Sequence, residues 1–340
     1  MNALERLTAA VFRRPVDRPP LICPGGMMTM VVREAMEQLH CAWPEAHTDA
    51  ALMARLGEGM VTLAGLENLG VPFCMTVEAE GMGGRVDLGH MTREPHVTGY
   101  ALAQPDELVK LRRLDPRQGR AAVSCEAVRL LKNSNPRLPV IANLTGPVSL
   151  ATSLVDPLLY YRALRRNPAA AHRLNDFCTE EAIRFGEALL NAGADHVCIA
   201  DPSATGDLLG PAAFKEFCLP YLNRMSEHFG NRRETGVIVH ICGNIKAIGQ
   251  LLPEIAAPVM SVDSIVSIKN LRELAPEKVA MGNVSTFTLE KGSPDKVAAA
   301  ASVCLGQGAE ILAPACGISP ITPLANIRAM ADLLESAVKS

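Results

Sequence analysis

The chain has 340 residues, of which 48% are hydrophobic and 20% are charged, and its formal net charge is −3. This composition supplies a large core and excludes the broad basic field that a nucleic-acid partner would require. We find no signal-peptide pattern and no apolar stretch of the roughly 20 residues that span a bilayer, so we expect a cytoplasmic protein with no membrane partner.

The first seventy residues are predicted to be mainly helical. Helices are expected at residues 2–12, 29–39 and 48–66. Pro15 ends the first of these helices and Asp49 can cap the third. A short buried strand is expected at residues 21–23. Residues 1–70 are therefore predicted to form a helical N-terminal extension packed on the rest of the chain.

After Gly70, short apolar runs typical of buried strands alternate with longer amphipathic runs. The strands are expected at residues 71–75, 139–142, 196–200, 237–240, 259–262, 279–281 and 310–313. The helices are expected at residues 118–131, 169–191, 211–229, 245–252, 267–274, 294–305 and 323–338. Strands that alternate with helices indicate an α/β fold with a parallel sheet.

The number of these repeats indicates the kind of α/β fold. With the strand at residues 21–23, eight strands favour a closed (β/α)₈ TIM barrel over a doubly wound sheet. We expect residues 1–340 to form one barrel domain. Residues 77–114 fit the repeat poorly and are expected to be an irregular insertion with a hairpin near residues 85–88.

Acidic side chains follow several of the predicted strands, at the end of a barrel where enzymes place their chemistry. Glu78, Asp201 and Asp263 are the catalytic candidates. Glu78, with the nearby Glu80, offers a base or a substrate contact, and the alternative is a solvated loop. Asp201 and Asp263 each end a strand and can orient a ligand, but either can instead cap the next helix.

Three further residues are candidates for binding a cofactor. Met27 and Met28 can form a flexible apolar contact with a large planar group, and the alternative for both is core packing. Asn143 follows the predicted strand at residues 139–142 and places an amide at the same rim.

His240, Cys242 and Cys316 form the candidate metal site. Residues i and i+2 of a strand point the same way, and Cys316 follows the last predicted strand, so all three can reach one ion. Two thiols and one imidazole with a fourth position open are typical of a catalytic zinc site. The alternative is that the two cysteines are unrelated buried thiols, because the chain has ten scattered cysteines.

The charge of such a site indicates its chemistry. Zinc with two thiolates and a neutral imidazole is formally neutral, and a substrate thiol in the open position becomes a thiolate at neutral pH. The two sulfur ligands keep that thiolate electron-rich, whereas a site with three histidines favours an activated water. The ligand set therefore favours alkylation of a thiol over hydrolysis.

Several segments of the sequence resemble the methylcobamide:coenzyme M methyltransferases, within the wider uroporphyrinogen decarboxylase superfamily. The resemblance covers essentially the whole chain. Its most specific part is the H-x-C motif with the late cysteine, which carries zinc in that family. The segments are residues 72–80, 199–207, 240–244 and 314–317.

The resemblance implies a (β/α)₈ barrel that docks a separate methylated corrinoid protein. It implies that a zinc-bound thiolate attacks the methyl group on Co(III), giving a methyl thioether and Co(I). His240, Cys242 and Cys316 correspond to the zinc ligands, and coenzyme M is the thiol acceptor that the family suggests. The chain has no D-x-H-x-x-G motif, so we expect the corrinoid on a partner protein.

Two other functions compete with this hypothesis. Uroporphyrinogen decarboxylases resemble the chain in fold, but they carry an arginine-rich segment after the first strand that grips the carboxylates of the substrate. Residues 23–28 stand at that place here and contain no arginine, which counts against this activity. The remaining alternative is a non-catalytic module that binds a corrinoid protein.

Overall fold

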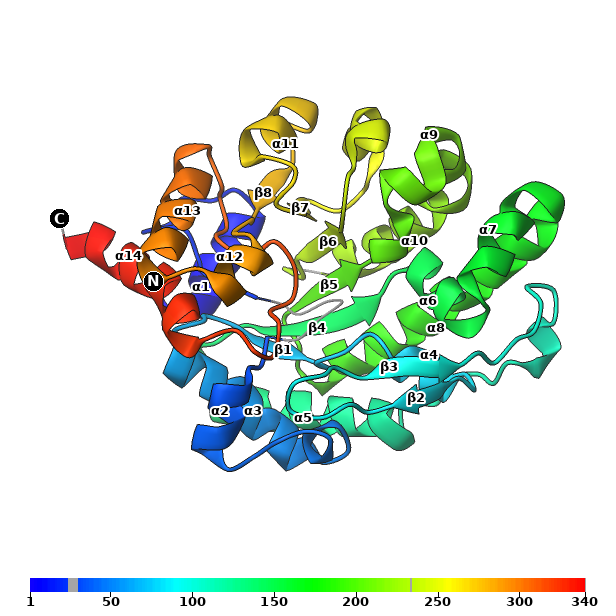
Figure 1. Ribbon diagram of the computed structural model, residues 1–340, viewed down its shortest axis with the longest axis horizontal. Helices are drawn as coiled ribbons and strands as arrows, with labels where there is room; N and C mark the ends of the chain where they lie inside the picture. Colours follow the sequence, from blue (N-terminus) through cyan, green and yellow to red (C-terminus); the bar gives the residue numbers. More distant parts are fainter. Residues whose placement is uncertain (24–29, 233, 340) are drawn as a thin grey trace.

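The computed structural model describes residues 1–23, 30–232 and 234–339 (Figure 1). Its centre is a parallel sheet of six strands. The strands, in spatial order, are β1 (Leu69–Val71), β4 (Val140–Thr145), β5 (His196–Ala200), β6 (Val237–Ile241), β7 (Val259–Val262) and β8 (Val279–Met281). Strands that follow one another in the chain also lie side by side in the sheet, except that the hairpin β2–β3 (residues 85–99) is inserted between β1 and β4.

Two short segments link the edges of this sheet. Ile311 forms a parallel bridge with Met281 of β8, and Leu312 forms one with Leu21. The carbonyl of Leu21 in turn accepts a hydrogen bond of 2.8 Å from the amide of Glu67, just before β1. Hydrogen bonds thus run from β8 back to the residue Glu67, just before β1, and the α/β fold expected from eight repeats is confirmed.

These two segments form isolated bridges instead of full strands. Pro20 directly precedes Leu21 and has no amide hydrogen to donate, which limits the ladder of hydrogen bonds on that side. The segment at Ile311 and Leu312 continues to a further parallel bridge, between Pro314 and Val284.

Helices surround the sheet, and several follow one another around it in direct contact: α3 packs on α5, α5 on α8 and α8 on α10. The helices are α1 (Ala3–Val11), α2 (Arg33–Leu39), α3 (Ala50–Ala64), α4 (Val77–Gly81), α5 (Gly119–Ser134), α6 (Pro147–Leu154), α7 (Pro157–Arg166), α8 (Pro168–Ala192), α9 (Gly206–Phe217), α10 (Leu219–Gly230), α11 (Ile268–Leu274), α12 (Thr286–Lys291), α13 (Pro294–Gly306) and α14 (Leu324–Lys339).

Two predicted helices differ from the observed ones. The helix expected at residues 211–229 is divided into α9 and α10 at Cys218, where Pro220 fits the first turn of a new helix but not the interior of a continuous one. The helix expected at residues 245–252 is a 3₁₀ helix, Lys246–Glu254. Helices α4, α6, α7 and α12 are not predicted by the sequence pattern.

The insertion after β1 contains the expected hairpin. Strands β2 (Arg85–Asp87) and β3 (His96–Gly99) pair antiparallel and lie on the right of Figure 1, away from the helix α1 at the left. Short 3₁₀ turns complete the described elements at Glu45–His47, Leu108–Lys110 and Pro202–Ala204.

Helix α1 closes the amino end of the barrel. Asn2 caps it, since its side chain accepts a hydrogen bond of 2.9 Å from the amide of Glu5 while Glu5 bonds back to Asn2. Leu7 and Val11 of α1 are buried in one apolar cluster with inward-facing residues of the strands. The functional site must therefore lie at the opposite, carboxyl end of the strands.

Residues 1–70 do more than extend the barrel. Leu21 lies in the ring of strands, and α3 packs against β1 and α5, so this region supplies one repeat of the barrel as well as α1. The assignment of the chain to one domain stays a prediction. Within the described residues, the structure holds no helix with the length and apolar character to cross a membrane.

Candidate metal centre

His240, Cys242 and Cys316 converge at the carboxyl end of the barrel. One nitrogen of the imidazole and the two sulfurs lie within 4.8 Å of one another. His240 belongs to β6 and Cys242 follows it by two positions, so the two side chains point to the same side of the strand. Cys316 approaches from the loop that follows Pro314. One ion can therefore be reached by all three side chains.

The two nitrogens of the His240 imidazole differ in their contacts with the described residues. Its Nδ1 lies 3.0 Å from the hydroxyl Oγ of Ser261 on β7. Its Nε2 has no hydrogen-bond partner among the described residues, and it is buried, since only 4% of the residue is exposed. A buried polar atom without a partner is destabilising, whereas a metal ion would use the lone pair of this nitrogen. The donor atoms thus fit zinc.

The two thiols interact with each other. Their hydrogen bond raises the pKa of the Cys242 thiol and lowers the pKa of the Cys316 thiol, so the pair holds a negative charge on Cys316 more readily than a free cysteine does. Thiolates are soft ligands that prefer zinc to magnesium or calcium. This pair is therefore suited to a zinc ion.

Asp263 lies beside Cys242. Its Oδ2 lies 3.4 Å from the sulfur of Cys242 and accepts a hydrogen bond of 3.2 Å from the amide of Gly243. Gly243 has a φ of +73°, and a Cβ on it would lie 3.0 Å from Oγ1 of Thr205. A glycine is needed at this turn, because another residue would be strained and crowded. Asp263 and Gly243 together fix the loop that carries Cys242.

The other two acidic candidates, Asp201 and Glu78, accept hydrogen bonds from backbone amides of neighbouring helices or strands. Asp201 is fully buried, and its carboxylate accepts hydrogen bonds from the amides of Val148 and Ser149 and from the Ser149 hydroxyl, at 3.1, 2.8 and 2.7 Å. It therefore caps helix α6. Burial raises the pKa of Asp201 to about 6.

Glu78 is buried in the same manner on α4. Its two oxygens accept hydrogen bonds from the amide of Thr145 at 2.8 Å and from the Thr145 hydroxyl at 3.1 Å. Burial raises the pKa of the Glu78 carboxyl. Both carboxylates thus hold the carboxyl end of the barrel together, and neither belongs to the group of three ligand atoms.

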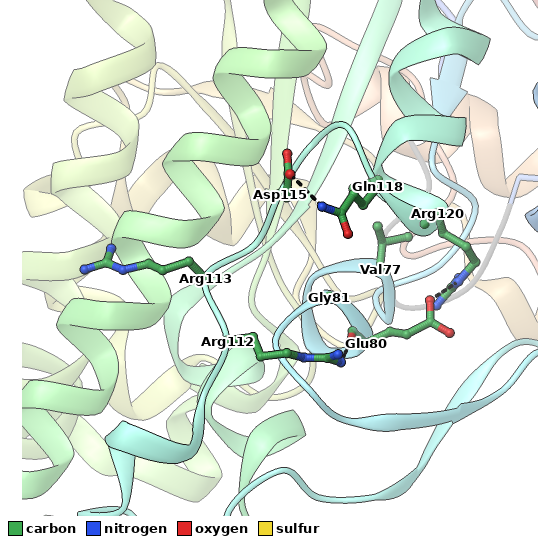
Figure 2. Close-up of a pocket in the computed structure, with 10 residues that line it drawn as sticks. Val77, Glu80, Gly81, Arg112, Arg113, Asp115, Gln118 and Arg120 are labelled. Carbon is green, nitrogen blue, oxygen red and sulfur yellow. Dashed lines mark hydrogen bonds and ion pairs between the residues drawn. The ribbon is translucent and has the colours of Figure 1, made fainter.

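Glu80, the neighbour of Glu78 in sequence, faces a separate pocket of about 330 Å³ (Figure 2). Its carboxylate accepts a hydrogen bond of 2.6 Å from the guanidinium of Arg120, which also donates to Cys74 and Thr76. Figure 2 shows the two side chains pointing toward each other at one side of the pocket. None of the three candidate metal ligands lines this pocket.

Asn143 lies inside the barrel on β4. Its amide nitrogen donates to the carbonyl of Pro72 at 3.0 Å, while its Oδ1 is buried without a hydrogen-bond partner among the described residues. Met27 and Met28, the other predicted cofactor contacts, lie outside the described residues.

Ser261 is the site residue that the sequence analysis does not identify. A serine inside an apolar strand carries no local signal, and its partner His240 is 21 residues away. The contact depends on the register of β6 and β7, which places Ser261 opposite His240.

The fold and this site define a barrel of a known family. The family model described as uroporphyrinogen decarboxylase (URO-D) matches residues 2–337, so the chain belongs to that family. Methylcobamide:CoM methyltransferase MtaA of Methanosarcina barkeri is 33% identical over 336 residues, which are 96% of this chain and 95% of that protein. MtbA of Methanosarcina acetivorans, with the same description, is 32% identical over 330 residues, which are 96% of each chain.

A solved structure described as a methyltransferase from Methanosarcina mazei has the same fold. It matches with a TM-score of 0.90 at 32% identity and covers 99% of both chains. The resemblance predicted from the sequence motifs is therefore confirmed, and these relatives are methyltransferases of the predicted methylcobamide:thiol type.

Proposed function

We propose that this chain is a zinc-dependent methyltransferase that moves a methyl group from a methylated corrinoid protein to a thiol such as coenzyme M. The observation that carries the proposal is the convergence of His240, Cys242 and Cys316, with the Nε2 of His240 buried and without a hydrogen-bond partner among the described residues. The relatives named above support the choice of donor and acceptor, because their descriptions name methylcobamide and CoM.

In this proposal His240 binds zinc through Nε2, and Cys242 and Cys316 bind it as thiolates. A zinc ion there lowers the pKa of an acceptor thiol and keeps its sulfur nucleophilic. The chain itself supplies the arrangement: Ser261 holds the imidazole, and Asp263 holds the turn at Gly243. The strands and α1 close the barrel below the site, so the acceptor and the methyl donor both enter from the carboxyl end.

The predicted contacts with substrate are assigned within this proposal. Asp263 is adjacent to Cys242 and is the acidic residue we place nearest the acceptor sulfur. Asn143 is placed as a contact of the cofactor, because its buried Oδ1 has no hydrogen-bond partner in the part of the chain that the structure describes. For Glu78 and Asp201, a direct catalytic role stays a prediction, since their carboxylates bond to backbone amides.

Metal analysis and a methyl-transfer assay test the proposal together. Purified protein should contain about one zinc per chain and should methylate coenzyme M with free methylcobalamin as donor. Replacement Cys316→Ala should remove the zinc and the activity, whereas Cys125→Ala, a buried cysteine on α5, should retain both. An active wild-type protein without metal would refute the proposal.

Uroporphyrinogen decarboxylation is the second candidate, because the matching family model carries that description. The absence of arginine from residues 23–28 counts against it, since a substrate with several carboxylates requires several cations. Incubation with uroporphyrinogen and analysis of the products separates the two functions. Release of carbon dioxide by metal-free protein would favour the decarboxylase.

A further inference from the structure

Ser261 is the residue of β7 that contacts the candidate metal site through His240. Strands β6 and β7 are parallel, and their register places Ser261 directly opposite His240. The Oγ of Ser261 lies 3.0 Å from Nδ1 of the imidazole. Only 3% of Ser261 is exposed, so water does not compete freely for this hydrogen bond.

The same relation repeats one step further along the two strands. Cys242 and Asp263 are each two positions beyond the first pair, and the Cys242 thiol contacts the Asp263 carboxylate at 3.4 Å. Since side chains two positions apart point to the same side of a strand, β7 presents a row of polar groups to the candidate ligands on β6. This alignment is a property of the fold and not of Ser261 alone.

The bond to Nδ1 decides which ring nitrogen remains for a metal. A neutral imidazole carries one hydrogen, and the nitrogen without it provides the lone pair that binds metal. When the Ser261 oxygen accepts a hydrogen bond from Nδ1–H, the lone pair lies on Nε2. That is the buried nitrogen with no partner among the described residues, and one nitrogen of this ring lies within 4.8 Å of the two sulfurs.

We propose that Ser261 is the positioning residue of the metal site, which fixes the orientation and tautomer of His240 so that Nε2 faces Cys242 and Cys316. The inference rests on the proposed zinc site and deepens it. A hydrogen-bond partner of a metal-bound histidine typically changes metal affinity by about 10- to 100-fold when removed. Ser261 therefore controls how tightly the site holds zinc without touching the ion.

Zinc affinity is the first measurement. Competition with a chromophoric chelator should show zinc bound about 10- to 100-fold more weakly by Ser261→Ala than by the wild type. Ser261→Thr keeps a hydroxyl and should recover most of the affinity. Ser226→Ala is the matched control, because Ser226 is equally buried on α10 and bonds to the carbonyl of Leu222, so this change removes a buried hydroxyl elsewhere.

A second measurement needs no variant. Nitrogen NMR of wild-type protein labelled in histidine should show zinc on Nε2 and hydrogen on Nδ1 of His240. The cobalt-substituted protein should have the visible spectrum of a tetrahedral site with two sulfurs, and Ser261→Ala should alter it. Zinc on Nδ1, or an affinity for Ser261→Ala within about twofold of that of Ser226→Ala, would overturn the inference.

The outcomes separate this inference from the proposed function. Wild-type protein that binds no zinc would overturn both. Tight zinc binding that is weakened by Ser261→Ala, without methyl transfer to a thiol, would reject the proposed reaction while supporting the positioning role. Tight binding with full methyl transfer and no effect of Ser261→Ala would reject the positioning role alone.

Discussion

Asp201 should make the stability of the barrel depend on pH in a direction that is opposite to the usual one for a carboxylate. The group is fully buried, and burial raises its pKa from 3.8 to about 6. Between about pH 4 and pH 6, the folded protein therefore keeps a proton on Asp201 that the unfolded chain has already released. The stabilisation is complete below about pH 4 and is lost as the pH rises through about 6.

The magnitude follows from the size of the shift. A difference of about two pKa units corresponds to about 3 kcal/mol, at about 1.4 kcal/mol for each unit. Replacement Asp201→Asn removes the titrating group but keeps a similar shape, so the other ionisable groups cancel when wild type and variant are compared. The stability of wild type relative to the variant should fall by about 3 kcal/mol between pH 4 and pH 7.5.

Paired thermal or denaturant unfolding of the two proteins over this pH range measures the difference. The three donors that bond to Asp201, two amides and one hydroxyl, favour the charged carboxylate and oppose the effect of burial. A difference in stability that stays constant, or that grows with pH, would show that these hydrogen bonds outweigh burial. The reasoning about Asp201 would then be wrong.

Three further substitutions test the loop that carries Cys242, the amino end of the barrel and the pocket beside Glu80. Gly243→Ala should lower the free energy of unfolding by about 1 kcal/mol or more and should weaken zinc binding, because φ is +73° and the new Cβ would contact Thr205. A zinc affinity equal to that of the wild type in a chelator titration would contradict this. Leu7→Ala should destabilise the protein by about 3 kcal/mol and leave the zinc content at the wild-type value, since Leu7 is buried at the amino end of the barrel. Loss of zinc in this variant would contradict the placement of the metal site at the carboxyl end. Arg120→Ala should destabilise the protein by about 2 kcal/mol in unfolding experiments, because Thr76 and Glu80 lose a charged hydrogen-bond donor. An unchanged free energy of unfolding would contradict this prediction.

The strands of the barrel can be predicted closely from the sequence where they are continuous apolar runs. The predicted strands at residues 196–200, 259–262 and 279–281 coincide with β5, β7 and β8. The short helices that follow strands are harder to predict. Helices α6 and α7 together replace what the sequence pattern leaves as a loop, because each is brief and is stabilised by distant contacts, such as the capping of α6 by Asp201.

The candidate site shows the same division. The convergence of His240, Cys242 and Cys316 can be expected from strand periodicity and from the order of elements in a barrel. The role of Ser261 cannot, because it depends on the register between two strands. Nor can the sequence show that Asp201 bonds to backbone amides of an earlier helix, since the side chain and its partners meet only in the folded protein.

X-ray absorption at the zinc edge tests the central claim most directly. The resting protein should show two sulfur scatterers at about 2.3 Å and a nitrogen at about 2.0–2.1 Å, and addition of coenzyme M should raise the sulfur count to three. A sulfur count that stays at two when the acceptor thiol is present, or a zinc ion bound only by nitrogen and oxygen, would contradict the account.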